Sequence, residues 1–367
     1  MVREAYAFNG QACKMNNTVF YQDKPVFGLD IGFSSLKVMQ VDTHNKHQVV
    51  SGYGVTGFDP KAIKDGVIVE PEIIAKVAYE LFDKQLVGEI TTRRVAVAVP
   101  AARTFTRSVT LPKLGTKDLA EAIRLETEQY VPVPIEELYV DHAVLSKTDK
   151  EQEVLVIAVP KKIVDSYVQL TTLLGLEMVA VETTISSASR LFVQAEQSDV
   201  PTVLIDLGSL SSDITIYDKA LIVTGTVPGG GDSFTTAIAE KLGITREEAH
   251  VVKTKYGLGL SKKQKEITDS LNPILDQMLK EIRRMIRYYE ERSGTERKIG
   301  QVVTMGGGAN MPGLSEHMTN LLRLPVRMCD PWQHMDFSGL QPPNTIEKSM
   351  YVTVSGLSLM NPREIFT

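Results

Sequence analysis

A short hairpin sequence occurs twice in this chain, and that repeat constrains the fold more than any other feature. Residues 27–42, FGLDIGFSSLKVMQVD, align without a gap with residues 203–218, VLIDLGSLSSDITIYD, at an offset of 176 residues. Each copy contains an apolar run, an Asp-x-Gly turn and a second apolar strand. A gapless repeat of this kind predicts the same hairpin at two places in the chain. The matched pairs are Asp30 and Asp206, Gly32 and Gly208, Ser35 and Ser211, and Asp42 and Asp218.

The residue types in these turns suit a phosphate group. Glycine has no Cβ, so backbone N–H groups can approach an anion closely, and neighbouring serines add donors. An aspartate at the strand end can hold Mg²⁺ through water, and Mg²⁺ then bridges phosphates. A single Asp-x-Gly is usually an ordinary β-turn. Two copies favour a pair of hairpins that clamp a nucleoside triphosphate from two sides.

Two further glycine runs follow the second hairpin in the chain. In VVTMGGGANMPGL, 302–314, an apolar strand leads into three glycines, which lets a strand end lie against a ligand. In TVPGGGDSF, Gly229–Gly231 come directly before a predicted helix at Asp232, which is a plausible anion or ribose site. Each run alone is common in loops, so the prediction rests on the order of these elements along the chain.

Strands and helices alternate from Pro25 onward, which predicts an α/β or mixed α/β architecture. The clearest helix is 272–292, with Pro273 in its first turn and an apolar stripe at helical spacing. Residues 1–24 are predicted to be a flexible arm with a short strand at 18–21. The predicted strands are 26–31, 36–42, 48–55, 94–99, 104–111, 138–145, 153–159, 178–182, 202–207, 213–217, 220–226 and 301–305. The predicted helices are 71–87, 117–130, 161–175, 184–197, 232–242, 245–254, 272–292 and 313–322.

Composition excludes several classes of function. The net charge of −5 argues against a general nucleic-acid binder. Cys13 and Cys329 form no CxxC motif and are expected to be free thiols in a reducing cytoplasm, and the six histidines have no metal-binding spacing. No apolar run approaches the roughly 20 residues of a membrane span, and the N-terminus lacks a signal peptide's apolar region. We therefore expect a cytoplasmic protein without direct membrane insertion.

Two phosphate hairpins followed by a glycine-rich strand, in this order, resemble the actin, Hsp70 and sugar-kinase superfamily. Residues 111–145, which include EQYVPVP and an acidic pair, and residues 175–192, 227–253 and 281–290 resemble the PilM family of type IV pilus assembly proteins. The resemblance covers about residues 25–360 and extends to the division protein FtsA.

The resemblance implies an α/β, actin-like two-half fold with duplicated sheets and an inserted α+β, SHS2-like domain. The implied domains are a 1–24 arm, a first half made of 25–91 and 179–201, an inserted domain 92–178, and a second half 202–367.

The resemblance also implies roles for residues in a site that binds ATP or ADP with Mg²⁺. Asp30 and Asp206 would hold Mg²⁺ through water, and Glu182 would orient the attacking water. The implied nucleotide-binding residues are Gly32, Phe33, Ser34, Ser35, Lys37, Gly208, Ser209, Ser211, Gly230, Gly231, Asp232, Glu248, Lys253, Gly306, Gly307 and Gly308. Phe33 departs from the family pattern, which has a small residue there. Its ring would either point into the core or crowd the γ-phosphate.

The family relation implies an ATP-binding adaptor on the inner face of the cytoplasmic membrane, in a type IV pilus or type II secretion platform. Its implied partner is the cytoplasmic N-terminal tail of a PilN-like membrane protein, bound in a nucleotide-sensitive way, and self-association into a ring or filament is also possible. Any ATPase activity would be weak.

Three alternatives stay open. The first is a small-molecule kinase, which needs a carboxylate base that the sequence does not show. The second is an FtsA-like division protein, although the C-terminal apolar run is short for a membrane helix. The third is a scaffold that binds nucleotide without hydrolysis, so that ATP only shifts a conformational population.

Overall fold

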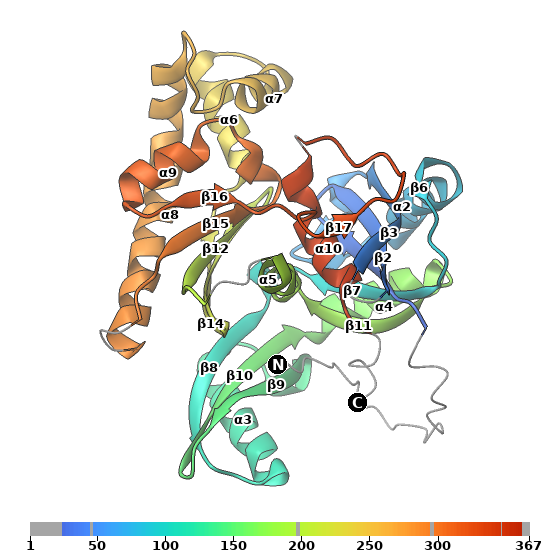
Figure 1. The fold of residues 1–367 in the computed structure, drawn as a ribbon, viewed down its shortest axis with the longest axis vertical. Coiled ribbons are helices and arrows are strands. Elements are labelled where there is room, and N and C mark those ends of the chain that lie inside the picture. The colour runs from blue at the N-terminus through green and yellow to red at the C-terminus, as the bar shows by residue number, and fades with distance from the viewer. Residues whose placement is uncertain (1–23, 45–46, 196–198, 294–296, 346, 362–367) are drawn as a thin grey trace. The chain divides into compact units, whose positions relative to one another are not determined.

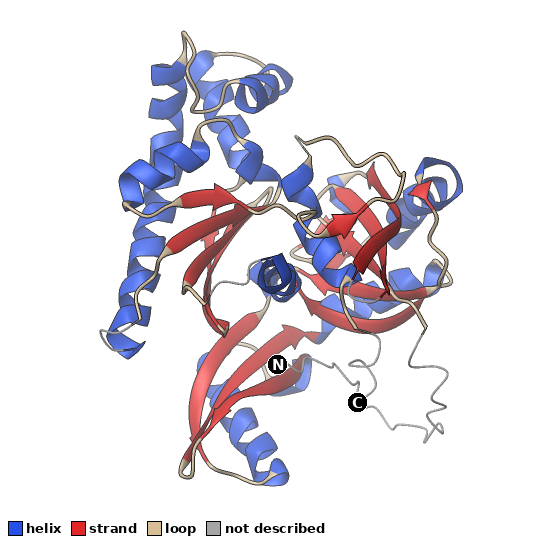
Figure 2. Cartoon of the chain, viewed as in Figure 1, coloured by secondary structure: helices blue, strands red, loops and turns tan. Residues whose placement is uncertain are grey.

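The computed structural model describes residues 24–44, 47–195, 199–293, 297–345 and 347–361 (Figure 1). The chain forms two compact units. The first contains the residues up to Leu191, Trp332–Pro342 and the residues from Thr353 onward. The second contains Phe192–Pro331 and Pro343–Val352. Each unit is built around a mixed β-sheet with helices packed against it (Figure 2).

The sheet of the first unit has the strand order β11-β7-β1-β2-β3-β17, with β6 paired to β3. The pairs β11–β7 and β7–β1 are parallel, and the pairs β1–β2 and β2–β3 are antiparallel. Its central strand β1 is fully buried, which is why it is mostly apolar, with Asp30 as its one charged residue. The strands are β1 (Phe27–Ile31), β2 (Ser35–His44), β3 (His47–Gly57), β6 (Val87–Gly88), β7 (Arg94–Val99), β11 (Glu177–Thr183) and β17 (Met335–Asp336).

The second unit contains five strands in the order β16-β15-β12-β13-β14, with the same pattern of two parallel pairs followed by two antiparallel pairs. These strands are β12 (Thr202–Leu207), β13 (Ser211–Asp218), β14 (Ala220–Pro228), β15 (Gln301–Met305) and β16 (Val326–Met328). The two sheets match in detail. The β2–β3 register shifts between Gln40 and Val41, and the β13–β14 register shifts between Ile216 and Tyr217, at the repeat's offset of 176 residues. The duplication predicted from sequence is therefore preserved down to a β-bulge.

Three antiparallel strands, β8 (Phe105–Pro112), β10 (Glu151–Pro160) and β9 (Leu138–Lys147), lie in the part of the chain predicted to be inserted. Helix α3 (Thr116–Tyr130) packs on it through Leu119 and Ile123. The predicted inserted range, 92–178, also takes in β7, which pairs with β1 in the main sheet, and α4 (Lys161–Leu173). Within that range, β8, β9 and β10 contribute no strand to the sheet that contains β1.

Four helices complete the first unit. Helix α2 (Pro71–Glu80) ends earlier than the predicted 71–87, because a π-helical turn at Leu81–Gln85 replaces its last residues. Helices α4, α5 (Thr184–Ala195) and α10 (Val352–Ser358) follow in the chain, with the end of α5 and the start of α10 assigned to the second unit. A Cβ on Gly28 of β1 would contact Leu357 Cβ at 2.7 Å, so α10 packs closely on this sheet.

The second unit carries α6 (Gly231–Leu242), α7 (Arg246–Lys255), α8 (Gln264–Ser293) and α9 (Leu314–Leu322). Helix α8 corrects a prediction, because it begins at Gln264 and Pro273 lies inside it rather than in its first turn. Tertiary packing overrides the proline penalty here, since the buried stripe continues on both sides of Pro273. Its buried members are Ile267, Leu271, Leu275, Met278, Leu279, Ile282, Met285 and Tyr289.

Most other predicted elements are confirmed to within about three residues at each end. The sequence did not predict the short strands β4 (Ile63–Lys64), β5 (Val67–Ile68), β6, β16 and β17, or helix α10. The strand predicted at 18–21, and Cys13, lie outside the described residues. Cys329 is a buried free thiol, as predicted. Among the helices described here, none is both long and apolar enough to cross a bilayer.

Candidate functional site

Three glycine loops of the second unit meet at the end of strand β12. Gly208 closes the β12–β13 turn by donating from its N–H to Ser211 O at 3.1 Å. The N–H of Gly231 donates to Gly208 O at 2.9 Å, and the N–H of Asp232 donates to Ser209 O at 2.9 Å. The start of α6 is thereby fixed on the hairpin turn. The structure thus brings the second hairpin and the 229–231 run together.

The close approach of these loops explains their glycines. A Cβ on Gly230 would lie 2.6 Å from Ser209 O, and a Cβ on Gly308 would lie 3.0 Å from Leu207 O. Gly306 has a φ of +81°, and a Cβ there would collide with the Asp206 carboxylate. Gly307 differs, because a Cβ added there would meet no atom within 4 Å. Three of the glycines are therefore needed for packing, whereas Gly307 faces open space where a ligand could lie.

Lys253 lies directly over the first turn of α6. Its Nζ donates to Gly231 O at 2.6 Å and to Thr235 Oγ1 at 2.8 Å. Burial lowers the pKa of Lys253, and the nearby negative charge of Asp232 partly opposes this effect. The amine is thus held by α6 itself, close to the Gly231 loop, instead of projecting into solvent.

Two other charged residues predicted for the nucleotide site, Asp232 and Glu248, both contact other protein groups. Asp232 lies in the first turn of α6 and forms an ion pair with Arg246. The Glu248 carboxylate accepts from the N–H of Thr245 at 2.9 Å in a capping box that begins α7. This capping hydrogen bond explains the position of the Glu248 carboxylate in the described structure. A contact between Glu248 and a base remains a prediction.

Two serines that the sequence analysis missed support the glycine loops. Ser349 is fully buried, accepts from the N–H of Gly306 through its carbonyl oxygen at 3.1 Å, and donates from Oγ to Gly306 O at 2.6 Å. Ser212 is buried and donates from Oγ to Gly229 O at 2.9 Å. Ser349 lies in the 3₁₀ turn Lys348–Tyr351, far along the chain, so no local pattern indicated it.

The first hairpin repeats the geometry of the second. The N–H of Gly32 donates to Ser35 O at 2.9 Å, which is the equivalent of the Gly208 bond. At the position of Asp213 in the second copy stands Lys37, whose Nζ donates to Asp30 Oδ2 at 3.0 Å. Both side chains of that pair are more than nine-tenths buried. The two predicted ligand-binding charges of this hairpin therefore neutralise each other in the described structure.

The turn itself is more accessible than its flanking strands. Phe33 is half-buried, Ser34 is exposed, and the carbonyl of Ser34 accepts from the N–H of Phe58 at 3.0 Å. The phenyl ring of Phe33 is therefore neither fully in the core nor fully in solvent. Whether it contacts a phosphate stays a prediction.

Glu182 lies in β11, in the same row of the sheet as Ala98 and Asp30. Its side chain is 1% exposed, and both carboxylate oxygens accept from Arg190 at 2.6 Å. Arg190 also donates to Gly356 O at 2.9 Å. Both oxygens of Glu182 thus accept from one guanidinium, and this bidentate pair fixes the position of the carboxylate. The water-orienting role of Glu182 stays a prediction.

Metal ligands are sparse in the region that the structure covers. Within the described residues there is no group of three or more His, Cys, Asp or Glu side chains arranged around one point. A metal held mainly through water, by single carboxylates such as Asp30 or Asp206, needs no such cluster.

The duplicated sheets, the matched hairpins and the converging glycine loops can be compared with known proteins. The family model described as type IV pilus assembly protein PilM matches residues 28–361. The chain belongs to this family. The PilM relation expected from the sequence is thereby confirmed.

Solved structures agree on the fold. One described as a PilM–PilN type IV pilus biogenesis complex has a TM-score of 0.80 and 22% sequence identity, covering 94% of this chain and 100% of that one. The ethanolamine utilization protein EutJ from Carboxydothermus hydrogenoformans has a TM-score of 0.56 and 17% identity, covering 92% of this chain and 90% of that one. The PilM-family chain therefore has the α/β, actin-like fold that its sequence predicted.

The cell division protein FtsA is a more distant relative. FtsA of Streptococcus pneumoniae is 24% identical over 355 residues, covering 83% of this chain and 75% of that protein. FtsA of Borreliella burgdorferi is 26% identical over 162 residues, covering 39% of this chain and 39% of that protein. The Borreliella match thus spans well under half of each protein. The relation to FtsA expected from sequence is confirmed as a similarity.

Proposed function

We propose that this PilM-family chain is a nucleotide-binding adaptor of a type IV pilus assembly platform. The observation that carries the proposal is the family match over residues 28–361, together with the duplicated glycine hairpin. The family description favours a pilus over a type II secretion system. In this proposal the adaptor works in the cytoplasm and is recruited to the inner face of the membrane by its partner.

The proposed ligand is ATP or ADP with Mg²⁺. Support comes from the second unit, where the Gly208, Gly231 and Gly306–Gly308 loops converge and Gly307 faces open space. Asp206, the penultimate residue of β12, lies beside Gly306 and is the proposed partner of the Mg²⁺ water shell. Gly32 and the adjacent serines of the first hairpin are proposed phosphate contacts, because their turn has the same backbone geometry.

We further propose that nucleotide acts by binding, with at most weak hydrolysis. The bidentate pair between Glu182 and Arg190 supports this, because the Glu182 side chain is only 1% exposed and its charge is already paired with a guanidinium. The ligand would then shift a conformational equilibrium rather than drive repeated work. Steady ATP turnover that disappears in Glu182→Ala would contradict this part of the proposal.

The proposed partner is the N-terminal cytoplasmic tail of a PilN-like membrane protein. The similar structure described as a PilM–PilN complex supports this choice. Titrating a synthetic PilN tail into the protein, with and without Mg·ATP, tests both the partner and the nucleotide sensitivity. Equal affinity in both conditions would remove the proposed coupling, and no binding would remove the partner.

A glycine substitution tests the nucleotide site without disturbing the fold. In Gly307→Ala the added methyl group meets no protein atom within 4 Å, so it should obstruct only a bound ligand. We expect unchanged thermal stability and weaker Mg·ATP binding. The matched control is Gly115→Ala, where the added Cβ meets only Asp118 at 4.0 Å. Equal ATP binding by both variants and the wild type would argue against a nucleotide at Gly307.

A further inference from the structure

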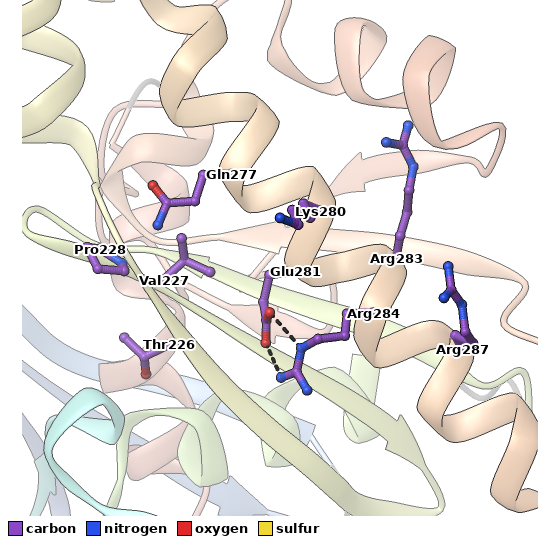
Figure 3. Close-up of a pocket in the computed structure, with 9 residues that line it drawn as sticks. All are labelled: Thr226, Val227, Pro228, Gln277, Lys280, Glu281, Arg283, Arg284 and Arg287. Carbon is purple, nitrogen blue, oxygen red and sulfur yellow. Dashed lines mark hydrogen bonds and ion pairs between the residues drawn. The ribbon is translucent and has the colours of Figure 1, made fainter.

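A basic hollow lies along helix α8 of the second unit, away from the glycine loops. It has a volume of about 570 Å³ and lies between α8 and the end of β14 (Figure 3). Figure 3 shows its cationic side chains leaving successive turns of α8. The lining residues on α8 are Gln277, Lys280, Glu281, Arg283, Arg284 and Arg287, and those on β14 are Thr226, Val227 and Pro228.

The charge of this hollow contrasts with the acidic chain. Four cations and one carboxylate line it, in a protein whose net charge is −5. The carboxylate of Glu281 accepts from Arg284 Nε at 2.8 Å, and this hydrogen bond lowers the pKa of Glu281, so the pair is internally neutralised. Neither the side chain of Lys280 nor that of Arg287 makes a hydrogen bond or ion pair with any residue in the described ranges. Two exposed cations thus remain available to a partner.

A second hollow, of about 650 Å³, continues along the same helix. Arg283 and Arg287 line both hollows, so the two are contiguous. Arg283 donates to Leu321 O at the end of α9 at 2.9 Å, which fixes its position between them. The second hollow is largely apolar in its walls, which are formed by Ile286, Ile299, Leu322 and Leu324, with Glu290 and Glu291 at its side.

We propose that these two hollows form a docking groove for a segment of another protein, in which acidic residues precede apolar ones. The acidic part would bind Lys280 and Arg287, and the apolar part would cover Ile286, Leu322 and Leu324. A free phosphate or nucleotide would leave the apolar half unused. A flat anionic membrane would meet the carboxylates of Glu290 and Glu291, which repel it. Charge complementarity to the cations, together with the adjoining apolar wall, therefore favours a peptide segment.

The test uses the full chain and a fluorescein-labelled peptide that carries a run of glutamates followed by leucines. We expect the double variant Lys280→Glu/Arg287→Glu to bind at least about tenfold more weakly, since each reversed charge replaces an attraction with a repulsion. All substituted side chains are exposed, so the fold should be retained. Raising the salt from about 0.1 M to about 1 M shortens the screening length from about 10 Å to about 3 Å and should weaken wild-type binding.

The matched control is Lys262→Glu/Lys263→Glu, which makes the same change of charge at exposed positions before α8. This control should bind the peptide like the wild type. A loss equal to that of the groove variant would mean a general charge effect and would overturn the proposal. Replacing the leucines of the peptide by serines should also weaken binding, and unchanged affinity would refute the apolar half of the groove.

Three further outcomes identify a different occupant, and each overturns the proposal. Inorganic phosphate that displaces the peptide at millimolar concentration would indicate a small-anion site. Binding of vesicles rich in anionic lipid that is lost in Lys280→Glu/Arg287→Glu would indicate a membrane surface. A change of the oligomeric state of that variant in sedimentation velocity would indicate that a second copy of the chain covers this face.

Discussion

The buried pair between Glu182 and Arg190 offers a sharp test of how the first unit is held together. The Glu182 side chain is 1% exposed and the Arg190 side chain is 21% exposed, with both contacts at 2.6 Å. In Arg190→Ala the carboxylate would stay buried without its counter-ion, and the bond to Gly356 O would also be lost. Breaking a buried pair in this way costs about 3–5 kcal/mol. We therefore expect the free energy of unfolding of the first unit to fall by that amount.

Urea unfolding followed by tryptophan fluorescence measures this change in the right unit. The chain has a single tryptophan, Trp332, which belongs to the first unit and contacts Phe337 edge-on at 5.5 Å between ring centroids. A shift of the midpoint without a change of slope gives the loss of stability directly. The matched control is Arg124→Ala, since Arg124 is 59% exposed and pairs with Glu128 at 3.2 Å on the surface. It should cost less than about 1 kcal/mol.

A second variant separates loss of charge pairing from loss of packing. In the double variant Glu182→Leu/Arg190→Met both charges are replaced by apolar groups, which is often neutral or stabilising for a buried pair. We expect it to recover most of the stability lost in Arg190→Ala. A cost for Arg190→Ala no larger than that of Arg124→Ala would refute the reasoning. It would mean that the Glu182 carboxylate gains water or another partner in Arg190→Ala, which would favour a catalytic role for Glu182.

The other predictions concern the second unit. Gly306→Ala forces a side chain into a φ of +81° and against the Asp206 carboxylate, so thermal unfolding should show a loss of about 1–3 kcal/mol, whereas Gly307→Ala should be neutral. Equal stability of the two variants would contradict this explanation of the glycine loop. Arg284 lowers the pKa of Glu281 mainly through its hydrogen bond, so the pair stabilises the fold above the ordinary carboxyl pKa and loses this effect as the pH falls through the lowered value. Because Arg284 is 68% exposed, the unfolding free energies of wild type and Glu281→Gln should differ by less than about 1 kcal/mol at pH 7. This difference should disappear in acid. A difference that grows in acid would contradict the expected sign. Pro273→Ala restores a helical N–H in the interior of α8 and should raise the unfolding free energy by about 1–3 kcal/mol in urea titrations, while a loss of stability would show that α8 needs the proline.

Much of the fold follows from local patterns that the sequence displays. The repeat at 27–42 and 203–218 predicted two like hairpins, and the resemblance that it carries implied two matching sheets. The two copies have the same turn hydrogen bond and the same bulge position. Apolar runs and helical periodicity located most long elements, because burial sets both patterns. The start of α8 could not be read correctly. Proline is normally a boundary signal, and only packing of Ile267 and Leu271 carries the helix past it.

The candidate site was only partly readable. Glycine runs indicated where loops approach each other, but their sequences did not show that Gly306 is needed for packing while Gly307 faces open space. Ser349 supports Gly306 from 43 residues away, and the pairing of Lys37 with Asp30 and of Arg190 with Glu182 depends on side-chain geometry. These contacts join elements that have no shared sequence pattern, so only the three-dimensional structure reveals them.

The most direct test of the proposed function is calorimetric titration of Mg·ATP into nucleotide-free protein and into Asp206→Ala. The account predicts binding on the order of micromolar affinity for the wild type. It predicts a loss of that binding in Asp206→Ala, because the Mg²⁺ water shell would lose its carboxylate at the end of β12. No measurable heat with the folded wild-type protein would contradict the account. The duplicated hairpins would then serve the architecture alone.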